Sequence, residues 1–251
     1  MPHTLFLYRK MNKKHFFIAA LLILVITACA PAESPTEEPS NMDEQPTATQ
    51  SRMDLTPAQR AAIGALSENL GLPADKIILV STEAADWPDR CLGVAEEGLD
   101  CTPTITPGFR ILLQANGREV EYRTNEDGTH IRPATVLMTW KREGGIAGFC
   151  DFMTIYLSGE GHGSSCKSGQ SVEQRLIDVL SKEEIAKLDE WVKSYGIVSI
   201  DAADPKGVSD RMVVTLTFTG LGSQETVSSA FQQQLLNFAQ DLHERLYFSF
   251  K

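Results

Sequence analysis

The chain has 251 residues, of which 33 are acidic and 23 basic, so its formal net charge is −10. Residues 1–28 carry four basic side chains and no acidic one, and removing these four positive charges from −10 leaves about −14 for the rest. This excess of acid argues against a nucleic acid partner, because phosphates are bound by clusters of Lys and Arg. It also argues against electrostatic adhesion to anionic lipids.

The N-terminal segment has the pattern of an export signal. Lys13 and Lys14 precede an uncharged apolar run, residues 16–28, which is too short to cross a hydrocarbon core of about 30 Å. The run ends in Ile26-Thr27-Ala28-Cys29, a segment that resembles the lipobox of bacterial lipoproteins. An ordinary signal peptide with an incidental cysteine is the alternative.

The resemblance to a lipobox implies that residues 1–28 are a signal peptide and that cleavage leaves Cys29 as an N-terminus carrying acyl chains such as palmitate. It implies a place in the cell envelope, anchored to the outer face of the cytoplasmic membrane or to an outer membrane where one exists. Residues 29–53 then form a lipidated tether. Their four prolines and many polar side chains offer too little apolar surface to offset chain entropy, so we expect disorder.

The rest of the chain is expected to form two small units, residues 54–133 and residues 134–251. Beyond Cys29 there are four cysteines, and an even number outside the cytoplasm argues for disulfides. Of the possible pairings, the local one places one bond in each unit, which favours Cys91–Cys101 and Cys150–Cys166. Zinc is the alternative, but the sequence has no C-x-x-C pair, so we expect neither a metal nor a cofactor.

Residues 54–133 predict a helix, a strand and a hairpin in that order. Thr56-Pro57-Ala58-Gln59 is a capping box that opens the helix, and Gly71 ends it. Asn116-Gly117 lies between two segments of alternating apolar and polar residues. This is the strongest short signal for a β-hairpin.

The same unit carries a set of aromatic, cysteine and turn residues: Trp87-Pro88-Asp89, Cys91-Leu92-Gly93, Cys101, Pro107-Gly108-Phe109-Arg110 and Tyr122. In these residues it resembles a small extracytoplasmic domain that recurs in secreted bacterial proteins, and its order of helix and hairpin resembles that of the PepSY domain. The resemblance covers about residues 56–133. It implies a fold and a compartment, and it supplies no catalytic residues.

The second unit begins with alternating segments that predict strands. Residues 136–140, 153–157 and 212–218 each place apolar side chains at every second position. Residues 159–169 are rich in Gly and Ser, and we expect them to form a flexible loop.

Helical segments follow the strands of the second unit. Ser181-Lys182-Glu183-Glu184 is a capping box that opens one helix, and residues 229–246 carry an apolar stripe that predicts another. The expected fold class is α+β, with two small disulfide-stapled units whose antiparallel sheets carry helices packed on one face.

Downstream of Cys29 the chain has three histidines. We expect His130 to end a strand and His243 to lie on the solvated face of the last helix. His162 lies among glycines and serines and is the one candidate for a general base beside a nucleophile. The sequence has no G-x-S-x-G elbow and no evident third group to orient the ring. We therefore expect His162 to be a mobile loop residue whose loss changes stability little.

Trp87 and Asp89 are possible binding residues, because Trp is enriched at interface hot spots; the alternative is that Trp87 fills the core. The sequence predicts a non-catalytic, lipid-anchored, extracytoplasmic binding module for a protein, a peptide or a cell-wall ligand. A protease-inhibitory or assembly-chaperone lipoprotein is the alternative, from the PepSY-like order alone. A hydrolytic enzyme that uses His162 is the third hypothesis.

Overall fold

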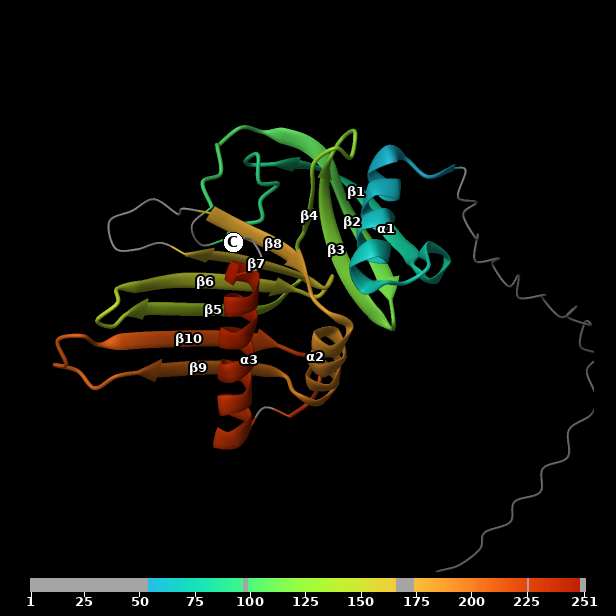
Figure 1. Cartoon of the computed structure of the whole chain (residues 1–251). Helices are drawn as coiled ribbons and strands as arrows, with labels where there is room; N and C mark the ends of the chain where they lie inside the picture. Colours follow the sequence, from blue (N-terminus) through green and yellow to red (C-terminus); the bar gives the residue numbers. More distant parts are fainter. Residues whose placement is uncertain (1–53, 97–98, 166–173, 225, 249–251) are drawn as a thin grey trace, which may run out of the picture. The chain divides into compact units, whose positions relative to one another are not determined.

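The computed structural model describes residues 54–96, 99–165, 174–224 and 226–248 (Figure 1). The expected signal peptide and tether lie outside these residues. The described part falls within one compact unit, and its strands form a four-stranded and a six-stranded sheet. All strand pairs within the sheets are antiparallel. The α+β fold class with antiparallel sheets and packed helices is therefore confirmed.

The expected helix precedes the four-stranded sheet, and the expected hairpin is part of that sheet. Thr56 and Gln59 form the capping box, and Gly71 ends the helix with a φ of 60°. Asn116 and Gly117 have φ angles of 51° and 75°, as a tight hairpin turn requires. The strand order is β1-β2-β3-β4. The elements are α1 (Pro57–Leu70), the short 3₁₀ helix η2 (Ala74–Lys76), β1 (Ile78–Trp87), β2 (Thr106–Ala115), β3 (Arg118–Asn125) and β4 (Ile131–Pro133).

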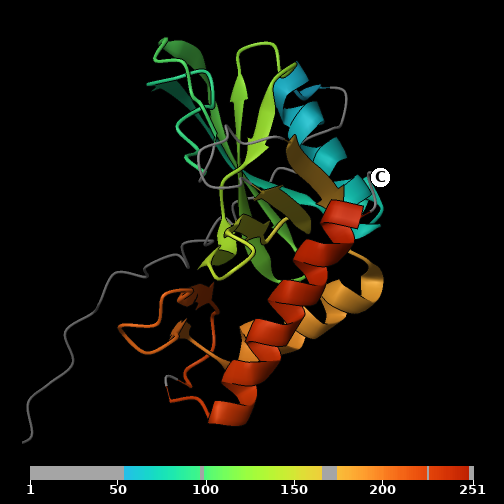
Figure 2. The same cartoon turned by 60° about the vertical axis from the view of Figure 1, so that its left-hand side comes forward.

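The six-stranded sheet has the order β8-β7-β6-β5-β10-β9, and α3 crosses one of its faces (Figures 1 and 2). Ser181 and Glu184 form the expected capping box at the start of α2. The elements are β5 (Val136–Gly144), β6 (Phe149–Tyr156), β7 (Glu160–Ser165), β8 (Gln174–Val179), α2 (Lys182–Ser194), β9 (Ile197–Ala203), β10 (Met212–Thr219) and α3 (Ser229–Phe248). Over the described residues, none of the helices combines the length and the apolar character needed to cross a bilayer.

The expectation of a flexible loop at residues 159–169 is wrong for its first half, where the chain forms the inner strand β7. The glycines of β7 have a packing role. A Cβ atom at Gly161 would lie 3.4 Å from a Leu246 methyl group, and one at Gly163 would lie 3.6 Å from it. The contact at Gly161 would be tight and the one at Gly163 an ordinary van der Waals contact, so it is glycine at position 161 that favours close packing of α3 on the strand.

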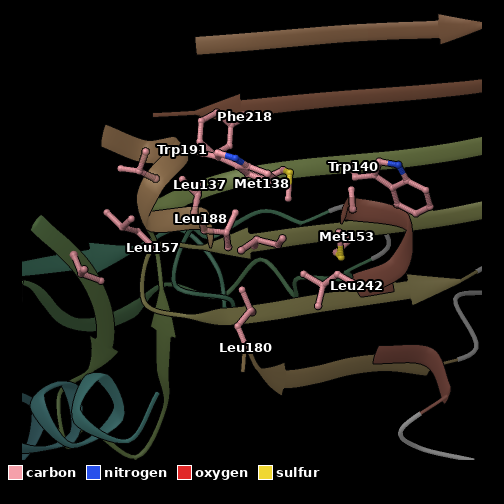
Figure 3. Packing of buried hydrophobic residues seen from close by; sticks show 14 of the residues in the cluster. Leu137, Met138, Trp140, Met153, Leu157, Leu180, Leu188, Trp191, Phe218 and Leu242 are labelled. Carbon is pink, nitrogen blue, oxygen red and sulfur yellow. The ribbon is translucent and has the colours of Figure 1, made fainter. Parts of the chain in front are cut away.

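Apolar side chains from both sheets and from all three of α1, α2 and α3 form one continuous core. Figure 3 shows part of it, with Trp140 and Met153 of the six-stranded sheet near Leu242 of α3. His243 also lies in this core, which contradicts the expected solvated position. It is 3% exposed, its ring lies 5.1 Å from that of Trp140, and burial lowers its pKa.

The structure bears on both expected disulfides. Cys91 and Cys101 are bonded, which confirms the first pairing. Cys150 is also disulfide-bonded, whereas Cys166, its expected partner, lies outside the described residues. The pairing of Cys150 with Cys166 therefore stays a prediction.

We predict that Gly108→Ala lowers the free energy of unfolding by about 3 kcal/mol, as expected for overpacking in a tightly packed interior. A Cβ atom there would lie 1.8 Å from the carbonyl oxygen of Thr124 on the neighbouring strand. Gly64→Ala is the matched control, because Gly64 is an exposed residue of α1 with open space around a new Cβ. The control should raise stability by about 0.5–1 kcal/mol. Urea denaturation measures the stability of both variants. Equal changes in the free energy of unfolding would contradict the close packing of Gly108 against Thr124.

Candidate binding cleft

The six-stranded sheet has one face under α3 and an opposite face with different side chains. Because side chains alternate along a strand, Trp140 and Met153 point into the core beneath α3. Their neighbours Thr139, Lys141 and Thr154 point to the opposite face. We call this second face the open face.

Strand register aligns the side chains of the open face in two rows that cross β10, β5, β6 and β7. Neighbouring side chains in a row are about 4.8 Å apart, the spacing of adjacent strands. The first row is Thr217, Thr139, Thr154 and His162, and the second is Thr215, Lys141, Phe152 and Ser164.

A cleft of about 430 Å³ lies over these rows. The rows form its floor, and the exposed Val136 of β5 also lines it. Ala95, Glu96 and Leu99 of the loop between β1 and β2 form a wall. This loop is closed by the Cys91–Cys101 disulfide. The cleft thus lies between a covalently closed loop and the six-stranded sheet.

Glu96 fixes the wall to the floor. Its side chain is 6% exposed, and its Oε1 atom accepts hydrogen bonds from Tyr156 Oη at 2.5 Å and from Arg132 Nη2. The same oxygen lies 3.0 Å from His162 Nδ1. Burial raises the pKa of Glu96, but the hydrogen bond and charge of His162, the Tyr156 hydroxyl and Arg132 outweigh it and lower that pKa to about 2.

His162 lies between two carboxylates, where the sequence predicted a mobile loop residue. Its side chain is 4% exposed, and Nε2 lies 3.1 Å from Glu160 Oε2 while Nδ1 faces Glu96. The ring also lies 4.8 Å from that of Tyr156. Each ring nitrogen thus faces a carboxylate oxygen, and the ring is held from both sides. The expected small effect of losing His162 is not compatible with this burial.

Glu160 extends the cluster to the four-stranded sheet. Its Oε1 atom accepts from Asn69 Nδ2 of α1 at 2.7 Å and from Tyr122 Oη of β3 at 3.5 Å. Burial and the charge of Glu160 raise the pKa of Tyr122, so the hydroxyl stays protonated and donates. The polar cluster therefore joins elements of both sheets beside the cleft.

Trp87 does not line the cleft. Its side chain is buried, and Nε1 donates to the carbonyl oxygen of Thr124 at 3.0 Å. The guanidinium group of Arg123 lies 4.8 Å from the centre of the ring. The indole packs inside the four-stranded part of the fold, which agrees with the core alternative for this residue.

Asp89 shapes the disulfide loop. Its carboxylate accepts hydrogen bonds from the backbone amides of Cys91 at 2.8 Å and Gly93 at 3.0 Å. It also lies near the sulfur atoms of Cys91 and Cys101, in a group with metal-ligand spacing. Those sulfur atoms are bonded to each other, and a metal ligand is the free thiolate.

Sequence reasoning missed Glu96, Arg132, Tyr156 and Glu160. The alternation from residue 152 to residue 156 could have placed Tyr156 on the same face as Thr154. No local pattern marks Glu96, because its partners lie 36, 60 and 66 residues away in the chain.

A comparison with known protein families finds a match in the first folded part of the chain. A family model described as a domain of unknown function (DUF8738) matches residues 59–133. The matched part runs from α1 to the end of β4, so it includes the cleft wall but not the floor strands. No curated protein and no solved structure matches the chain.

We predict that Glu96→Gln lowers the free energy of unfolding by about 3 kcal/mol near neutral pH. The pKa of Glu96 is lowered from 4.5 to about 2 on folding, so its charge stabilises the fold above about pH 4.5. That contribution is lost as the pH falls from about 4.5 to about 2. The stability difference between wild type and variant should shrink over this range.

Denaturation at several pH values checks this, with Glu126→Gln as the control because Glu126 is exposed. The control should change stability by no more than about 0.5 kcal/mol. A difference between wild type and Glu96→Gln that does not vary with pH would contradict the role of the Glu96 charge.

Proposed function

We propose that this protein is a non-catalytic, lipid-anchored, extracytoplasmic binding module that holds a protein, peptide or cell-wall ligand in the cleft over the open face. The observation that carries the proposal is a cleft with unused hydroxyl groups on its floor and a wall fixed by Glu96. Binding sites are commonly largely pre-formed hollows with a few well-placed polar groups.

The cleft has the dimensions of a ligand site. Its volume of about 430 Å³ lies within the range of roughly 300–1,000 Å³ typical of small-molecule pockets. The hydroxyls of Thr139, Thr154, Thr215 and Thr217 make no hydrogen bond to another protein group within the described part of the chain. These groups are available to a ligand.

A hydrolytic enzyme is the second candidate, because the cleft brings together Glu96, His162 and Ser164. In a serine hydrolase, one ring nitrogen of the histidine faces the carboxylate and the other faces the serine hydroxyl. Here Nε2 of His162 faces Glu160 instead, so the ring has no nitrogen directed at Ser164. This contact pattern supports binding over catalysis.

The proposed location rests on the lipobox-like segment that ends at Cys29. We predict that Cys29→Ser abolishes acyl labelling and moves the protein from the membrane fraction to the soluble fraction, because the sulfur atom of Cys29 is where the lipid is attached. Ser34→Ala, in the same polar segment, is the control and should remain in the membrane fraction. Metabolic labelling with a fatty-acid analogue and cell fractionation measure the result. A Cys29→Ser protein that stays with the membranes, beside an unlabelled wild type, would refute the anchor.

We test ligand binding by placing the photoreactive residue benzoylphenylalanine at Val136, which lines the cleft and is 38% exposed. Gln234 is the control position, because it is an exposed residue of α3, on the helix that covers the other face of the sheet. We expect light-dependent adducts in cells for the full chain labelled at Val136 and none for the chain labelled at Gln234. Absence of adducts at Val136 would count against a ligand in the cleft.

A further inference from the structure

We infer that the ligand of the cleft is an extended saccharide chain that lies across the strands and binds the row of threonine hydroxyls. This inference rests on the proposed binding function and names its ligand class. The floor offers mainly hydroxyl groups, each of which can both donate and accept a hydrogen bond. A saccharide chain presents hydroxyl groups of the same kind at short, regular intervals.

The threonine row provides the repeat. Thr217, Thr139 and Thr154 lie directly opposite one another on β10, β5 and β6, about 4.8 Å apart from strand to strand. Ser199 of the edge strand β9 pairs with Thr217 and continues the row. The row is therefore a ladder of hydroxyls on four adjacent strands.

Ser164 gives a second, independent indication that a polar ligand enters the cleft. It is 6% exposed and lines the cleft. Its hydroxyl has no hydrogen-bond partner among the protein groups that the structure describes. The hydroxyl oxygen is nevertheless not fully enclosed by protein atoms. Buried polar groups are almost always hydrogen-bonded, so this hydroxyl has room for a partner that arrives from the cleft.

The position of the floor within the sheet argues for a saccharide over an extended peptide. Peptides that add to a sheet bind the free backbone groups of an edge strand. The floor strands β10, β5 and β6 are each paired on both sides, so they offer side chains alone.

The aromatic residue of the two rows is buried, so the floor offers no exposed ring to a peptide side chain. Phe152, its aromatic residue, is 8% exposed, and the ammonium group of Lys141 lies 5.1 Å from the centre of the ring. Five of the eight side chains in the two rows carry a hydroxyl and one carries an ammonium group, which suits hydrogen bonding to a hydrophilic chain.

The test is calorimetric titration of the full chain, purified in detergent, with β-1,4-linked oligosaccharides of two, four and six sugars. N-acetylglucosamine oligomers and glucose oligomers serve as separate probes, so that recognition of hydroxyls is distinguished from recognition of acetamido groups. We expect at least one series to bind, with an affinity that rises with chain length because longer chains reach more of the row.

The Thr139→Val, Thr217→Val double variant should weaken binding about tenfold or more, since each lost hydrogen bond costs roughly threefold to tenfold. Thr219→Val is the matched control, because Thr219 is exposed on the same strand and does not line the cleft. Thr139→Ser keeps the hydroxyl and should retain binding. Valine is a good strand former, and an unchanged melting temperature confirms that the variants fold.

The outcomes separate the two proposals. If no oligosaccharide binds but the photoreactive residue at Val136 captures a protein or peptide, the saccharide inference is wrong and the binding function stands. If neither experiment gives a result, both are wrong. If the Thr219→Val control weakens binding as much as the Thr139→Val, Thr217→Val double variant does, the threonine row is not the binding site.

Discussion

The carboxylate of Glu96 is the contact on which the cleft depends. One of its oxygens is shared by Arg132, Tyr156 and His162, and through it the loop between β1 and β2 contacts the six-stranded sheet. A buried carboxylate is costly unless it is paired and hydrogen-bonded. Here Arg132 and Tyr156 donate to the oxygen that also faces His162, and these contacts hold the loop in place.

The polar contacts of Glu96 continue from the loop to both sheets. His162 bridges Glu96 to Glu160, and Glu160 reaches α1 and β3 through Asn69 and Tyr122. The four-stranded sheet thus contacts the floor strand β7 both through the loop and through its own helix. The continuous apolar core supplies most of the stability by burial, while the polar cluster sets the position of one sheet's loop over the other sheet.

Local sequence signals predicted the elements whose stability is local. The capping boxes at Thr56 and Ser181 and the Asn116-Gly117 turn depend on neighbouring residues, and they were found at the expected places. Strand β7 was missed because Gly161 and Gly163 have low strand propensity, and the atoms that lie near them, from Leu180 and Leu246, are distant in sequence.

The cleft could not be predicted in the same way. His162 and His243 are buried by residues that are distant in sequence, so neither the glycine-rich context nor the helical pattern gave their surroundings. The threonine row depends on the register of β10 against β5 and of β5 against β6. Register across a sheet is set by long-range packing, and single-strand alternation identifies only which residues share a face.

Burying the charged groups of the ionic cluster costs free energy, and this cost bears on the function of the cluster. An ion pair in the interior can often be replaced by apolar residues of similar volume without loss of stability, whereas removal of one partner costs about 3–5 kcal/mol. Stability alone therefore does not require Glu96, His162 and Glu160 at this place. Directional hydrogen bonds fix the distance and orientation of the groups that they join, which apolar packing does less strictly. A cluster of this kind suits a protein whose function requires the loop to stand at a fixed height above the threonine row.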